Sequence, residues 1–96
     1  MPIQKGDTVS LLGIGRCALA VAEHLTARGV RVYAYDDGAV PKCQRERLAA
    51  LDVPVYENGA GELKGSTVFR APAVRPDAPR LCRAALRGMT VTTEAE

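Results

Sequence analysis

The sequence has few of the residues that many ligand and cofactor sites depend on. It has no tryptophan, three tyrosines, one phenylalanine and a single histidine, His24, which leaves little for stacking on bases or sugars. Its three cysteines, Cys17, Cys43 and Cys82, are odd in number and widely spaced. Neither a disulfide framework nor a zinc site is therefore expected, and we assign no metal ligands.

Strong charge and long apolar runs are missing as well. The formal net charge is only +2, which does not favour nucleic acid as a partner. No apolar run approaches the ~20 residues that cross a bilayer, so no membrane partner is expected. The first residues lack the apolar core of a signal peptide, and a cytoplasmic location is expected. With 96 residues, of which 47% are apolar, the chain predicts one globular domain over residues 1–96.

Short apolar runs alternate with amphipathic stretches. The runs and their flanking glycines predict strands at residues 8–12, 31–35, 53–56, 67–71 and 89–93. Helices are predicted at residues 16–28, 41–51 and 78–87, with a further helical turn near Leu63. Asp77 is expected to cap the last helix, whose buried face would hold Leu81, Cys82, Ala85 and Leu86. Strands that alternate with helices indicate an α/β, Rossmann-like, doubly wound five-stranded parallel sheet with helices on both faces.

Three segments of such a sheet would meet beyond the carboxyl ends of its strands. Gly13 permits a tight turn and Gly15 a close backbone approach, while Arg16 and Cys17 begin a helix whose free N–H groups favour a phosphate. Two further groups complete the candidate site, namely the acidic pair Asp36 and Asp37 after the second strand and Pro72 with Ala73 after the fourth. No catalytic residues are assigned.

Each of these features also has a purely structural interpretation. The glycines can serve close packing alone, and Asp36 can be a solvated strand end. Cys17 can be a packed small residue rather than a thiol activated by the helix. Arg80, Arg83 and Arg87 would form a solvated face of the last helix.

The order of these pieces resembles the N-terminal domain of the Mur ligases, and in particular the members that add D-glutamate. The likeness is carried by residues 12–15, 32–37, 69–74, 76–81 and 91–96. It implies a bacterial protein of peptidoglycan synthesis in which this domain holds the UDP moiety of UDP-N-acetylmuramoyl-L-alanine or a related UDP-sugar. The diphosphate would face the backbone at Gly15, Arg16 and Cys17.

The resemblance also implies where the chemistry lies. In the family, ATP and magnesium are used by a central and a C-terminal domain, so no cofactor is expected in this chain. It would be a fragment of the full ligase and inactive alone. Two other functions stay open: an NAD(P)-binding module of an oxidoreductase or sensor, with Asp36 on the ribose hydroxyls, and a degenerate, non-binding interaction domain. The alanines Ala71 and Ala73 in the loop after the fourth strand suggest the latter.

Overall fold

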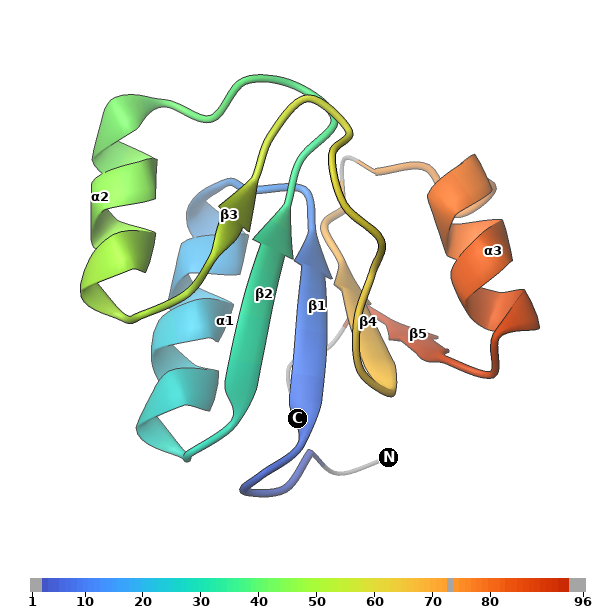
Figure 1. Cartoon of the computed structure of the whole chain (residues 1–96), viewed down its shortest axis with the longest axis horizontal. Helices are drawn as coiled ribbons and strands as arrows, with labels where there is room; N and C mark the ends of the chain where they lie inside the picture. Colours follow the sequence, from blue (N-terminus) through green and yellow to red (C-terminus); the bar gives the residue numbers. More distant parts are fainter. Residues whose placement is uncertain (1–2, 73, 94–96) are drawn as a thin grey trace.

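A computed structural model describes residues 3–72 and 74–93. The strands are β1 (Thr8–Leu12), β2 (Arg31–Tyr35), β3 (Val55–Tyr56), β4 (Thr67–Arg70) and β5 (Thr90–Thr92). The helices are α1 (Arg16–Ala27), α2 (Lys42–Ala50) and α3 (Pro79–Leu86). All the strands are parallel and lie in the order β3-β2-β1-β4-β5 (Figure 1). The α/β, Rossmann-like sheet predicted from the sequence is thus confirmed.

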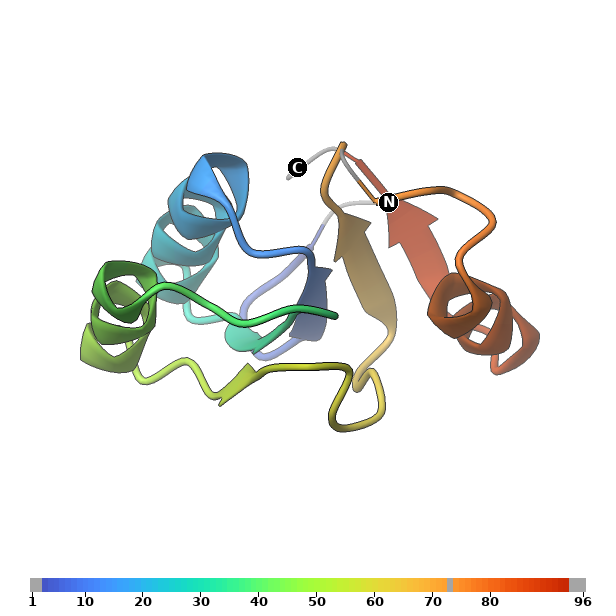
Figure 2. The ribbon, with the colours of Figure 1, turned by 90° about the horizontal axis from the view of Figure 1, so that it is seen from above.

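The central strands β1, β2 and β4 are largely buried on both faces, as a parallel sheet with helices on each side requires, whereas the edge strands β3 and β5 are partly exposed. Alternate strand residues point to opposite faces: Val9 and Leu11 pack with α1, whereas Leu12 packs with α3. Figure 2 shows α1 and α2 on one side of the sheet and α3 on the other. The largest of these described helices, α1, has only 12 residues, and none of the described helices is a candidate membrane span.

The segment between β3 and β4 is not helical where a turn was expected near Leu63. It crosses the α3 side of the sheet as irregular chain, and Leu63 is 2% exposed. Ser10 fixes this segment to β1, because its Oγ donates to the Lys64 carbonyl at 2.6 Å and accepts from the Lys64 amide at 2.8 Å. The buried Leu63 side chain and the hydrogen bonds of the Ser10 hydroxyl therefore hold this segment in place without the expected helical turn.

Helix α3 departs from the sequence prediction at its start and on its buried face. Its N-cap is Ala78 and no side chain caps it; Asp77 instead pairs with Arg75 at 3.1 Å. The buried residues are Leu81 and Ala84. The expected face was wrong in three places, since Cys82, Ala85 and Leu86 are exposed. The sequence gives the helical period, but only the contact with β5 and the 57–66 segment fixes which side turns inward.

Candidate nucleotide site

The strand order reverses direction beside β1. The chain passes from β1 through α1 to β2 on one side, and later places β4 on the other side of β1. At such a point the loops that follow the two strands leave toward opposite faces, which opens a crevice at the carboxyl edge of the sheet. The loops after β1, β2 and β4 all begin at this edge.

Gly13 and Gly15 have different roles in the turn after β1. Gly13 has a φ of +92°, and a Cβ built on it would lie 2.8 Å from Val74 Cγ2 and 2.9 Å from Ala71 Cβ. Glycine is therefore needed there for backbone conformation and for the close approach of the loop after β4. Gly15 has a φ of −143°, and a Cβ on it would have no atom within 4 Å. Gly15 thus faces open space.

Gly15 is also the N-cap of α1. No described side chain caps this helix end, and its first turn holds no acidic residue. Arg16 and Cys17 follow as exposed residues. The N–H groups of an uncapped first turn carry partial positive charge and suit an anion.

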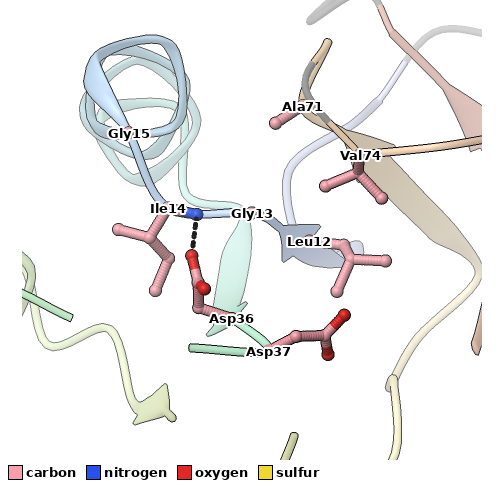
Figure 3. Close-up of a pocket in the computed structure, with 8 residues that line it drawn as sticks. All are labelled: Leu12, Gly13, Ile14, Gly15, Asp36, Asp37, Ala71 and Val74. Carbon is pink, nitrogen blue, oxygen red and sulfur yellow. Dashed lines mark hydrogen bonds between the residues drawn. The ribbon is translucent and has the colours of Figure 1, made fainter. Parts of the chain in front are cut away.

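The two aspartates after β2 both accept hydrogen bonds from the protein, and Figure 3 shows the bond between the Ile14 amide and Asp36. Asp36 Oδ2 accepts from the Ile14 amide at 2.8 Å and Oδ1 accepts from the Gly38 amide at 2.8 Å. This carboxylate therefore braces the glycine turn, rather than standing as the solvated strand end of the structural interpretation. Asp37 is 67% exposed, and its Oδ1 accepts from Arg80 Nη1 at 3.2 Å.

These loops enclose a cavity of about 270 Å³. It is lined by Leu12, Gly13, Ile14, Gly15, Asp36, Asp37, Ala71 and Val74 (Figure 3). A second hollow of about 510 Å³ adjoins it, because both are lined by Asp37 and Val74. It continues toward Arg75, Asp77 and the start of α3.

The cavity brings together part of the site expected from the sequence. Gly13, Gly15, Asp36 and Asp37 line it. Arg16, Cys17 and Pro72 lie outside the lining set, and Ala73 lies outside the described residues.

Sequence reasoning had not assigned Leu12, Ile14, Ala71 or Val74 to the site, although they lie within the segments considered. For Leu12 and Ile14 the available signal is their place beside Gly13, because apolar residues next to a tight turn form its walls. Ala71 and Val74 flank Pro72 and Ala73, which the sequence assigned to the site.

The solvated arginine row expected on the last helix is only partly present: Arg83 is exposed, whereas Arg80 and Arg87 bind other parts of the protein. The Arg80 side chain is 11% exposed. Arg87 Nη2 donates to the Leu63 carbonyl at 3.0 Å, and its Nη1 lies 3.5 Å from Glu62 Oε2. Both arginines therefore hold the segment between β3 and β4 against α3. Sequence patterns do not predict these contacts, because the acceptors are backbone carbonyls of a segment distant in the chain.

Among the described residues, no group of three or more histidine, cysteine, aspartate or glutamate side chains could hold a metal ion. All three cysteines are free and exposed. The cavity is thus lined by the glycine turn after β1, two carboxylates and apolar walls.

Comparison with known proteins points to one family. No family model matches the chain. It is 39% identical over 95 residues to the UDP-N-acetylmuramoylalanine–D-glutamate ligase of Frankia casuarinae. The ligases of the same name from Chlorobaculum parvum and Ruminiclostridium cellulolyticum are 31% and 32% identical over 94 and 97 residues.

These matches cover 95–96% of the chain but only 20–21% of each ligase. The chain spans about a fifth of the length of the curated relatives it matches. The sequence match extends over the residues of the whole five-stranded sheet. By sequence the chain is therefore similar to the Mur ligases that add D-glutamate, over about one fifth of their length.

Proposed function

We propose that the chain binds the UDP moiety of UDP-N-acetylmuramoyl-L-alanine, as the substrate-binding part of an ATP-dependent ligase that adds D-glutamate in peptidoglycan synthesis. The observation that carries this proposal is the cavity at the switch point, into which the uncapped N-terminus of α1 opens at Gly15. The names of the relatives support the substrate.

In this proposal the diphosphate lies against the backbone N–H groups of Gly15, Arg16 and Cys17. Backbone donors at a helix start hold an anion with no side-chain charge. The nucleoside extends past Asp37 toward Val74. The cavity of about 270 Å³ is small for a nucleotide, and the adjoining hollow of about 510 Å³ supplies the further space.

The ATP-dependent step is not assigned to this chain. The sequence has no G-x-x-x-x-G-K-[ST] phosphate loop, and no described cluster of side chains fits a metal ion. The residues present therefore do not fit ATP with magnesium. The chain's own contribution is to bind and orient the nucleotide end of the substrate.

Gly15→Ala tests the proposal. The backbone at Gly15 accepts alanine and its Cβ meets no protein atom, so the variant keeps its stability. The added methyl group enters the space proposed for the diphosphate. We expect the affinity for UDP-N-acetylmuramoyl-L-alanine, measured by NMR titration, to fall by at least about tenfold, equivalent to one lost charge-assisted hydrogen bond.

Uridine without phosphates is the control ligand, and its weaker binding should not change in Gly15→Ala. Shifts of the wild-type chain should cluster at residues 13–17, 36–37 and 71–74. Shifts confined to other regions, or stronger binding of NADH than of the UDP-sugar, would contradict the proposal.

A further inference from the structure

Arg80 connects α3 with the rim of the cavity through several contacts. Its Nη2 donates to the Gly61 carbonyl at 2.6 Å and to the Ala60 carbonyl at 3.2 Å. Its guanidinium carbon lies 5.3 Å from the centre of the Tyr35 ring. With two backbone acceptors and an aromatic face around it, the guanidinium group has a fixed place, and a planar fork of donors suits this arrangement better than a lysine would.

The remaining contact of Arg80 is with the candidate site. Nη1 donates to Asp37 Oδ1 at 3.2 Å, and only the arginine of this pair is largely buried, with side-chain exposures of 11% and 67%. Asp37 lines both hollows, whereas Arg80 lies outside both lining sets. The arginine is thus the fixed partner that determines where the exposed carboxylate lies.

We infer that Arg80 is a positioning residue for the nucleotide site and acts through Asp37. It holds the carboxylate at the cavity mouth in one orientation, with Oδ2 left to accept from the ligand. It also balances a negative charge that would otherwise repel a diphosphate nearby. This inference rests on the proposed function.

The test is a double-mutant cycle on the 96-residue chain, in which the affinity for UDP is measured by calorimetry. We expect Arg80→Gln and Asp37→Asn each to weaken UDP binding by about tenfold, equivalent to one charge-assisted hydrogen bond. The double variant should bind no worse than the weaker single variant, because both changes remove the same interaction. Arg83→Gln, an exposed arginine on the same helix, is the matched control and should bind like the wild type.

A purely structural role of Arg80 would make the two losses multiply, and that result would overturn the inference. Asp37 is exposed, so Asp37→Asn keeps the fold even if Arg80→Gln does not, and unchanged affinity in Asp37→Asn would overturn the inference as well. If the wild-type chain binds UDP and Arg80→Gln binds it equally well, only the inference fails. If the wild-type chain does not bind UDP, the proposed function fails too.

Discussion

At the scale of single residues, Asp36 binds backbone N–H groups of the protein itself, whereas the sequence predicted that it contacts a bound nucleotide. Each of its two carboxylate oxygens accepts one backbone N–H, from Ile14 and from Gly38. The bond to Ile14 joins the loops after β1 and β2 across 22 residues of sequence. Because Ile14 lies between the two glycines, this bond orients the turn that carries Gly15.

Replacing Asp36 with asparagine should therefore destabilise the protein. The amide has one acceptor oxygen, so one of the two backbone N–H groups then faces an NH₂ donor. We expect the free energy of unfolding in urea to fall by about 1–2 kcal/mol. Asp37→Asn is the control and should cost less than about 1 kcal/mol, because it removes one exposed ion pair. Equal losses in the two variants would show that Asp36 is not a brace.

At the scale of elements, α3 is held by a narrow apolar contact and by arginines. Leu81 and Ala84 are its buried residues, while Leu86 is 88% exposed. Arg80 and Arg87 reach carbonyls of the segment between β3 and β4. The helix is thus fixed to the sheet by one short stripe and to a loop by hydrogen bonds, and it carries the outer wall of the second hollow.

Truncation of the two leucines of α3 should have very different costs. Leu81→Ala leaves a cavity under the helix, and we expect a loss of about 2–3 kcal/mol in unfolding free energy. Leu86→Ala removes an exposed side chain and should change stability by less than about 0.5 kcal/mol. Urea unfolding of both variants checks this. A large loss of unfolding free energy in Leu86→Ala would instead indicate that Leu86 is buried, as the sequence predicted.

At the scale of the whole molecule, Tyr35 ties the sheet to the segment that covers it. Its ring stacks on Tyr56 with centroids 4.9 Å apart, and its hydroxyl donates to the Glu62 carbonyl at 2.8 Å. The residue is fully buried, and burial raises the pKa of its phenol above the ordinary value of 10.0. Ionising this phenol is therefore less favourable in the folded protein than in the unfolded chain.

This pKa shift predicts how stability depends on pH. The folded state holds the Tyr35 proton more tightly than the unfolded chain, so its contribution is complete below pH 10 and is lost as pH rises through the folded pKa. Tyr35→Phe should be less stable by about 1 kcal/mol near pH 8, having lost one hydrogen bond. Its unfolding free energy should fall less steeply than that of the wild type above pH 10. Tyr33→Phe serves as the control, and parallel curves for wild type and Tyr35→Phe would refute the assignment.

The sequence by itself determined what local chemistry controls. Apolar runs, helical periods and the glycines that flank them predicted the order of strands and helices. Together they predicted a parallel α/β sheet and the edge at which its site would lie. Bounds were less well predicted, since β3 has two residues where four were expected, because strand length depends on pairing with a neighbour.

Tertiary structure decided what depends on residues far apart in sequence. The strand order, the inward side of α3 and the irregular path near Leu63 follow from packing between elements. The partners of the charged groups do so too, since Arg80 and Asp37 are 43 residues apart. Local patterns specify which conformations are favourable, but a hydrogen bond or a buried contact exists only once the fold brings its two halves together.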